Sequence, residues 1–556
     1  MPNVAEAIRA HAAARPDQPA LVFPGEDYRT EAPTWQQWTF AELDRESDAY
    51  ARGFVAAGVR VADRVVVLVR PSLSFYAVML GLFKLGATPV LLDPGMGIRA
   101  LLACIERTRP RVSIAAPAVH AVASTVARRS FASVETKITA GARWFWGGTT
   151  LAACRREGAD PFALAERAPG DDAAILFTSG STGSAKGVTL TQSMFRAEVA
   201  SLGESFGFRP GDKDVQAFAA FAIFDLCLGH TAILPKMDYS RPATAAPADF
   251  VAAIEAHGPS ITFASPIVWQ NVSRYCVERG LTFPSVRTLI TVGAAIPAYL
   301  HRRMQQILPP GGQVWTPYGA TEGLPLTRIG TDEILGETWA KTARGAGTCV
   351  GALAPGATIR VIPIVDGPIP TWSDALALPA GVLGEIVAGG DQVSPSYKDA
   401  PEADALAKIR DGDRILHRMG DVGYLDEQGR LWFCGRKAHR VETADGSVFG
   451  ADAVEGVFNE HPSVFRTALV GLGPRGRQVP VVCVEMEPGQ VFGPTTEAEL
   501  RALAAGTPVE GKIAAFLPHP GFPTDARHNS KIRREDLLGW ASARVPAEVA
   551  RAAPRG

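Results

Sequence analysis

A run of small and hydroxylated residues is a candidate anion-binding loop. Residues 173–190 read AAILFTSGSTGSAKGVTL, an apolar stretch followed by a polar loop. Glycines allow a tight turn that directs N–H groups to one point, and the hydroxyls and a lysine add donors and positive charge. The sequence therefore predicts a polyphosphate-binding loop. Its residues are Thr178, Ser179, Gly180, Ser181, Thr182, Gly183 and Lys186.

The spacing of this loop differs from that of the Walker A motif. That motif requires Gly-x4-Gly-Lys-Ser/Thr, whereas Lys186 lies three residues after Gly183 and is followed by Gly187. A Ser/Gly-rich surface loop without a ligand stays the alternative interpretation, because such loops are common. The choice between the two depends on the rest of the chain.

Four further stretches place polar side chains where a nucleotide could bind. In residues 318–322, YGATE, a hydroxyl stands beside a carboxylate, which suits phosphate contact and Mg²⁺ ligation. Asp421 offers an acceptor for a ribose diol, and Arg436 brings a guanidinium to a suspected domain junction. Lys531 is a lone lysine in a polar stretch near the C-terminus. Each stretch alone is a weak signal, because turns and solvated termini have similar compositions.

An alternation of strands and helices is expected to position these residues. Residues 64–71 and 88–92 are apolar strand patterns, and a helical pattern between them, 74–85, ends at Gly86. This order predicts a βαβ unit and hence a parallel sheet. The polyphosphate loop is expected between a strand over 173–177 and a helix over 192–206, and the alternation continues to about residue 345.

The pattern of expected helices and strands changes twice in the second half of the chain. Short strands and turns dominate residues 346–434, including a hairpin signal at 426–430, which predicts a small β-barrel-like subdomain. Residues 436–556 return to a mixed α/β pattern. We therefore expect an α/β protein with a large domain over residues 1–435 and a small domain over 436–556.

Composition excludes several classes of protein. The 56 basic and 57 acidic residues give a net charge of −1, which argues against a nucleic-acid binder. The seven cysteines show no CxxC spacing and are expected to be reduced, buried thiols of a cytoplasmic protein. The sequence has no uninterrupted run of about 18 apolar residues, so no membrane span is expected. The first residues lack the apolar core of a signal peptide.

Taken in order, the five motifs resemble the core motifs of the adenylate-forming (ANL) superfamily. This superfamily contains acyl-CoA synthetases, peptide-synthetase adenylation domains and luciferases. The resemblance extends from Ala20 to Arg533, nearly the whole chain. It implies ATP and Mg²⁺ as cofactors and a small, mobile C-terminal lid domain that carries a catalytic lysine.

The resemblance also implies roles for individual residues. The loop over 178–187 corresponds to the loop that holds the β- and γ-phosphates of ATP. Thr321 would contact the α-phosphate, Glu322 would ligate Mg²⁺, and Lys531 would bridge the carboxylate and the α-phosphate as the catalytic lysine. The remaining nucleotide-binding positions would be Gly293, Ala294 and Ala295 beside adenine, Tyr318 stacked on adenine with Gly319 following it, Asp421 on the ribose and Arg436 as a second nucleotide contact.

Departures from the common pattern narrow the resemblance to one branch. Gln192 replaces the usual histidine after the phosphate loop, Met419 replaces the usual threonine before Gly-Asp, and Ala438 occupies the hinge position. Together with residues 144–148, 345–351, 458–462 and 527–531, they resemble the olefin-biosynthesis β-lactone synthetases. That branch adenylates a long-chain 2-alkyl-3-hydroxy acid, and the 3-hydroxyl then displaces AMP to form a β-lactone.

Two alternatives stay open from the sequence. One is a long-chain acyl-CoA synthetase or acyl-AMP ligase, and the other is a nucleotide-binding scaffold without catalysis. The resemblance implies association with other olefin-biosynthesis enzymes and leaves a peripheral contact with a membrane open. Three further features have either a structural or a functional interpretation: the aromatic stretch 144–146, the apolar run 221–234, and the pair Asp225 and His230, for which a structural role is preferred to a role as base.

Overall fold

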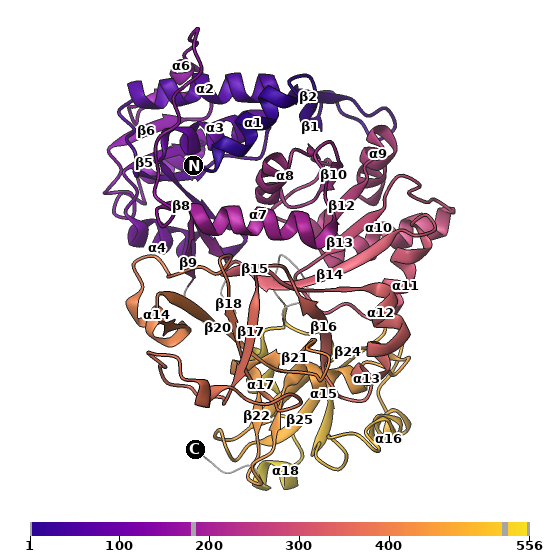
Figure 1. Ribbon diagram of the computed structural model, residues 1–556. Helices are drawn as coiled ribbons and strands as arrows, with labels where there is room; N and C mark the ends of the chain where they lie inside the picture. Colours follow the sequence, from indigo (N-terminus) through magenta and orange to yellow (C-terminus); the bar gives the residue numbers. More distant parts are fainter. Residues whose placement is uncertain (1–2, 179–184, 525–531, 553–556) are drawn as a thin grey trace.

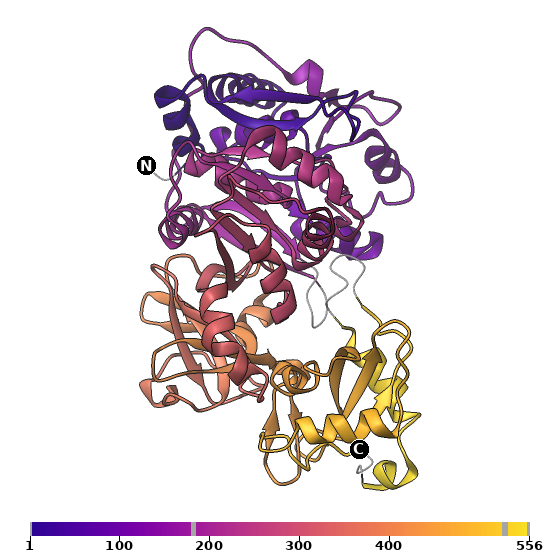
Figure 2. The ribbon, with the colours of Figure 1, turned by 90° about the vertical axis from the view of Figure 1, so that its right-hand side faces the viewer.

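The computed structural model describes residues 3–178, 185–524 and 532–552. The N-terminal half forms two α/β layers at the top of the view, a β-rich part lies below them, and the C-terminal residues form the opposite end (Figure 1). The view turned by 90° shows the C-terminal part to one side of the β-rich part (Figure 2). The predicted α/β class and the small β subdomain are confirmed, and the sheets are mixed.

The first sheet has seven strands in the order β7-β6-β5-β3-β4-β8-β9. All neighbours pair in parallel except β8 and β9, which form an antiparallel hairpin at the edge. Helix α3 (Leu73–Leu85) ends at Gly86, whose φ of 76° is left-handed, as the sequence predicts. The strands are β3 (Arg64–Leu68), β4 (Thr88–Leu92), β5 (Val112–Ala115), β6 (Thr136–Thr139), β7 (Thr149–Thr150), β8 (Asp172–Thr178) and β9 (Lys186–Thr191).

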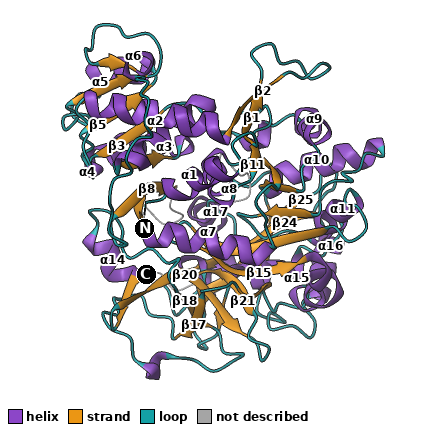
Figure 3. Ribbon diagram, turned by 45° about the horizontal axis from the view of Figure 1, so that its top comes forward, coloured by secondary structure: helices purple, strands orange, loops and turns teal. Residues whose placement is uncertain are grey.

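The second sheet has a parallel centre and antiparallel margins. Its order is β2-β1-β11-β10-β12-β13-β14-β15, and β14 and β15 form an antiparallel hairpin. Helix α7 (Gln192–Phe206) crosses between this sheet and the first in the view of Figure 3. The strands are β1 (Pro19–Pro24), β2 (Trp35–Thr39), β10 (Lys213–Gln216), β11 (Thr231–Ile233), β12 (Ile261–Ala264), β13 (Thr288–Thr291), β14 (Gln313–Ala320) and β15 (Gly323–Gly330).

The remaining helices of the two layers connect these strands. Helix α2 begins with a capping box, in which Thr39 and Glu42 exchange side-chain and backbone hydrogen bonds. The helices are α1 (Ala5–Ala14), α2 (Phe40–Ala56), α4 (Ile98–Thr108), α5 (Pro117–Ser124), α6 (Leu151–Cys154), α8 (Ala222–Leu228), α9 (Pro247–His257), α10 (Pro266–Arg279), α11 (Ala298–Gln306), α12 (Thr331–Glu333) and α13 (Trp339–Thr342).

The small β subdomain continues the second sheet. Strand β16 pairs with β15, and the ladder proceeds β16-β21-β20-β18-β17, with β19 beside β20. The predicted hairpin turn at 426–430 joins β20 to β21, and Gly429 there has a φ of 75°. The elements are β16 (Thr348–Leu353), β17 (Thr358–Ile362), β18 (Gly384–Gly389), β19 (Lys408–Asp411), β20 (Arg414–Leu425), β21 (Leu431–Arg436) and helix α14 (Pro401–Ala407).

The C-terminal residues form two small sheets and hydrophobic clusters of their own. Two clusters of buried apolar side chains contain only residues from 441 to 549. These clusters support a separate small domain, while the boundary at residue 435 and the mobility of that domain stay predictions. The elements are β22 (Val441–Glu442), β23 (Val448–Phe449), α15 (Ala451–Phe458), β24 (Val464–Leu472), β25 (Val479–Met486), α16 (Pro494–Leu503), β26 (Ala515–Pro518), α17 (Arg534–Ser542) and α18 (Ala547–Ala552).

The structure places a strand after the polyphosphate loop that the sequence did not predict. The expected order around the polyphosphate loop was strand, loop, helix, but β9 stands between the loop and α7. The alternating Val188-Thr189-Leu190-Thr191 was a usable signal, because β-branched residues favour strands.

All seven cysteines are buried and free, as predicted. Within the described ranges, no helix has the length and apolarity needed to cross a membrane.

Candidate nucleotide site

The β8–β9 hairpin carries the predicted polyphosphate loop at its tip. Strand β8 ends at Thr178 and β9 begins at Lys186, and these two residues pair across the ladder. A side chain at Gly187 would meet the ring of Phe177 at 2.6 Å, which explains the glycine after the lysine. Residues 179–184, which include Ser179, Gly180, Ser181, Thr182 and Gly183, lie outside the described residues, as does Lys531. Their roles stay predictions.

The β14–β15 hairpin carries the second set of predicted residues. Thr321 and Glu322 form the turn between the two strands, and both side chains are half-buried at the wall of the main cavity. The hydroxyl of Tyr397 donates a hydrogen bond to Glu322 Oε1 at 2.7 Å. Among the described residues, no hydrogen bond reaches Glu322 Oε2. One carboxylate oxygen is therefore held by the protein at the wall of the cavity.

Three predicted residues form a hydrogen-bonded chain across two strands and the hairpin. Tyr318 donates to Asp421 Oδ2 at 2.6 Å, and Arg436 donates to Asp421 Oδ1 at 2.8 Å. Burial raises the pKa of Asp421, and the Arg436 guanidinium acts against that increase. Burial, followed by the adjacent Asp421, raises the pKa of Tyr318 well above its usual value. Arg436 lines the cavity, whereas Asp421 and Tyr318 are not among its lining residues and contact it through Arg436 and the hairpin.

The predicted adenine-binding segment lies between β13 and α11. Gly293 lines the same cavity as Lys186 and Glu322, and its φ of 110° is a conformation that favours glycine. Ala294 is half-buried and Ala295 is exposed. Gly319, in β14, also lines the cavity, and a side chain there would meet the carbonyl oxygen of Gly323 at 2.7 Å. The structure therefore places these backbone segments at one opening.

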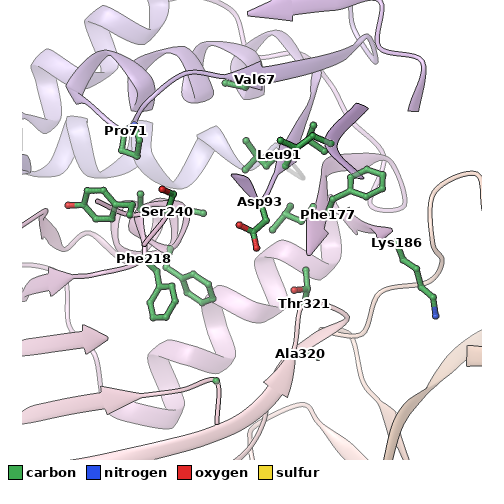
Figure 4. A pocket seen from close by; sticks show the side chains of 18 of the residues that line it. Val67, Pro71, Leu91, Asp93, Phe177, Lys186, Phe218, Ser240, Ala320 and Thr321 are labelled. Atoms are coloured by element: carbon green, nitrogen blue, oxygen red, sulfur yellow. The ribbon is translucent and has the colours of Figure 1, made fainter. Parts of the chain in front are cut away.

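One cavity of about 2110 Å³ connects these polar residues to an apolar interior. Figure 4 shows Thr321, Asp93 and Lys186 towards one side of the cavity, with Phe218 and Ser240 towards the other. Apolar side chains come both from the first α/β layer and from the second. They are Leu101, Val119 and Phe131 from the first layer and Phe218, Phe221 and Met237 from the second.

The three ambiguous features of the sequence are largely structural. Within the run 221–234, Phe221 lines the cavity, whereas the following helix α8 is mainly buried core. His230 Nδ1 lies 3.4 Å from Asp225 Oδ1, both side chains are buried, and neither lines the main cavity. This position favours the structural interpretation. In the aromatic stretch, Trp146 is buried while Trp144 and Phe145 are exposed, and none of the three lines the cavity.

Sequence reasoning missed two side chains of the site. Asp93 follows β4 directly, is buried and lines the cavity. A carboxylate at the carboxyl end of a buried parallel strand was a usable signal for it. Tyr397, which contacts Glu322, lies in a loop before α14 and carried no signal in the sequence.

The donor set fits a magnesium ion bound together with phosphates. The described residues contain no cluster of three or more His, Cys, Asp or Glu side chains arranged for a metal. Mg²⁺ commonly binds through only one or two carboxylates plus substrate phosphates and waters. Glu322, with one oxygen held by Tyr397, meets that requirement at the cavity wall.

Comparisons with known proteins agree with this arrangement. The family model of AMP-binding enzymes matches residues 8–398. The chain is 44% identical over 551 residues to an olefin beta-lactone synthetase of Stenotrophomonas maltophilia, covering 98% of each chain. It is 43% identical over 552 residues to an olefin beta-lactone synthetase of Xanthomonas campestris pv. campestris, covering 97% of each.

The fold is also found in a solved structure. An amide bond synthetase from Marinactinospora thermotolerans superposes with a TM-score of 0.78, at 20% identity, over 97% of this chain and 99% of the other. This likeness concerns the fold, whereas the matched family model and the two close relatives concern the family. With a nucleotide-type site on two hairpins and these relatives over its whole length, the chain belongs to the AMP-binding enzymes, in the family of the olefin beta-lactone synthetases.

Proposed function

We propose that this protein activates a long-chain 2-alkyl-3-hydroxy acid with ATP and closes it to a β-lactone. The observation that carries the proposal is the single cavity that joins Lys186, Thr321 and Glu322 to a deep apolar wall. An acid whose carboxylate reaches the polar end can place its hydrocarbon in the apolar part. The olefin beta-lactone synthetases at 43–44% identity support the lactone as the product.

The first step is adenylation of the acid. A carboxylate oxygen attacks the α-phosphorus of ATP, and the bond to pyrophosphate breaks. Two anions must meet, so cations and hydrogen-bond donors around the phosphates lower the barrier. We assign this role to the phosphate-loop residues, Lys186 and Lys531, while Glu322 would hold Mg²⁺, which neutralises phosphate charge when bound.

The second step closes the ring. The oxygen of the 3-hydroxyl attacks the carbonyl carbon of the acyl-AMP, the bond to AMP breaks, and the hydroxyl proton is released. Because the nucleophile is tethered to the electrophile, the step has an intramolecular proximity advantage. Release of AMP drives the formation of the strained four-membered ring. The apolar walls from both α/β layers suit an acid that carries hydrocarbon on two sides of the reacting carbon.

Lys531 provides the test for catalysis as opposed to nucleotide binding alone. We expect Lys531→Ala to reduce pyrophosphate release by about 10²–10³-fold, as expected for loss of one group that stabilises transition-state charge. Binding of ATP, measured by calorimetry, should persist. Equally slow pyrophosphate release by the wild type and the variant would instead favour a non-catalytic scaffold.

Product analysis tests the complete reaction. The protein is incubated with ATP, Mg²⁺ and a synthetic 2-alkyl-3-hydroxy acid without CoA, and the lactone ring protons are followed by NMR. We expect a β-lactone, AMP and pyrophosphate in equal amounts. A strict requirement for CoA, with a thioester as product, would show an acyl-CoA synthetase instead. The same preparation allows a pull-down test for association with other olefin-biosynthesis enzymes.

A further inference from the structure

A short segment between β18 and α14 contacts both hairpins of the site. We call residues 393–398 the linking segment. Val393 forms an isolated β-bridge with Gly323 of the β14–β15 hairpin, and Tyr397 forms one with Val188 of the β8–β9 hairpin. Both bridges are antiparallel. The linking segment therefore joins two parts of the site that belong to different sheets.

Hydrogen bonds reinforce this connection. The Ser394 amide donates to the carbonyl oxygen of Glu322 at 2.7 Å, and the Ser394 hydroxyl donates to the carbonyl oxygen of Thr189 at 2.8 Å. The Lys398 amide donates to the carbonyl oxygen of Gly187 at 2.7 Å. The backbone around Glu322 and the backbone after Lys186 are thus tied to the same six residues.

Tyr397 extends the connection to the side chains. It is 5% exposed, and its hydroxyl donates to Glu322 Oε1 at 2.7 Å. Lys186 Nζ lies over its ring, 4.9 Å from the centroid, and Lys408 Nζ lies 5.2 Å from the same centroid. A cation within about 6 Å of an aromatic face is attracted to it. One side chain therefore contacts both the carboxylate of one hairpin and the lysine of the other.

We propose that Tyr397 is a positioning residue that fixes Glu322 for Mg²⁺ and sets the distance between Glu322 and Lys186. A hydrogen bond to one carboxylate oxygen fixes the rotamer and presents the other oxygen to a cation. The same ring limits where the Lys186 ammonium can lie. This inference rests on the proposed function, because it assigns the metal to Glu322. It adds a residue that acts through the ligand and not on the substrate.

The test removes only the hydroxyl. In Tyr397→Phe we expect the Mg²⁺ concentration for half-maximal pyrophosphate release to rise by about tenfold, as for loss of a residue that supports a metal ligand. Binding of Mn²⁺ in the presence of a non-hydrolysable ATP analogue, followed by electron paramagnetic resonance, should weaken to the same degree. Binding of the analogue without metal, measured by calorimetry, should change less than about twofold, since the phenol does not act on the nucleotide.

A matched control separates this role from general effects of a Tyr-to-Phe change. Tyr299→Phe removes a hydroxyl that donates to Gln270 at an exposed site, and it should leave all three readouts unchanged. Thermal melting of both variants shows whether the fold is kept.

Three outcomes overturn the inference, and they differ from failure of the proposed function. Wild-type metal dependence in Tyr397→Phe shows that the hydroxyl does not position Glu322. A large loss of metal-free analogue binding shows that the phenol contacts the nucleotide directly. Unfolding of Tyr397→Phe, with Tyr299→Phe intact, shows a purely structural role. Failure of the wild type to release pyrophosphate from any 3-hydroxy acid would instead contradict the proposed function.

Discussion

The two hairpins of the site have the same architecture and opposite chemistry. Each continues a parallel sheet with one antiparallel strand: β9 after β8 in the first sheet and β15 after β14 in the second. The first hairpin begins its second strand with Lys186, whereas the second carries Glu322 in its turn. One therefore presents a cation, which we assign to phosphate, and the other an anion, which we assign to Mg²⁺.

The hairpins also differ in how their sheets continue. Strand β9 is the last strand of its sheet, whereas β15 pairs onward with β16 and leads into the small β subdomain. An edge strand has unpaired backbone groups that can bind another segment. In this protein the linking segment takes that position beside β9, through Val188 and Tyr397. The comparison indicates that the hairpin with the predicted phosphate loop depends on the second half of the chain for its position.

The largest effect is expected from neutralising the anionic hairpin. Glu322→Gln keeps the shape of the side chain and removes its charge, so pyrophosphate release should fall by about 10²–10³-fold. The exposed Glu427→Gln is the control, because that residue lies in the hairpin turn at 426–430, away from the cavity. Activity of Glu322→Gln close to that of the wild type would show that this hairpin does not hold the metal.

Neutralising the cationic hairpin should have a smaller effect. Loss of a hydrogen bond to a charged group costs about 1.5–3 kcal/mol, so Lys186→Met should lower kcat/KM for ATP by about 10–100-fold. Steady-state kinetics at saturating acid measures this change. The exposed Lys213→Met is the control. An effect on the KM of the acid alone would place Lys186 on the acyl side of the cavity instead.

A pH dependence of stability is predicted from Lys408, whose Nζ lies 5.2 Å from the centroid of the Tyr397 ring. Burial lowers its pKa to about 8, whereas a free lysine has a pKa of about 10.4. Between these values the unfolded chain binds more protons, so the free energy of unfolding rises with pH above about 8, and this gain is lost as pH falls back through 8.

Lys408→Met should remove that rise, on the order of 2 kcal/mol between pH 7.5 and 10. Urea denaturation at the two pH values gives the difference between wild type and variant, and the exposed Lys512→Met is measured in parallel. If the wild type and Lys408→Met show the same pH dependence, burial of Lys408 does not disfavour its charged form in the folded protein.

The smallest effect is expected at the link between the hairpins. Ser394 is fully buried, and its hydroxyl bonds to the carbonyl of Thr189. Ser394→Ala should lower the free energy of unfolding by about 1 kcal/mol, the usual contribution of one hydrogen bond. Urea denaturation measures it, with the exposed Ser373→Ala as the reference. A difference within error between the two variants would mean that this bond does not stabilise the link.

Local patterns predicted most elements of the first sheet. Strand β4 has the bounds read from the sequence, and the predicted helix end at Gly86 is present. These features depend on neighbouring residues, so a single sequence contains them. Strand β9 was missed, because its pairing with β8 is formed across the loop and its four alternating residues were included in the loop.

The sequence by itself determined the motif residues and their order along the chain. Tyr318, Asp421 and Arg436 were named from motifs, and the fold brings them into one hydrogen-bonded chain. Only the tertiary structure decided that Tyr397 stands between Glu322 and two lysines, and that Asp93 lines the same cavity. The physical reason is that such contacts join segments from different sheets, whose positions follow from the packing of the whole core and not from any local pattern.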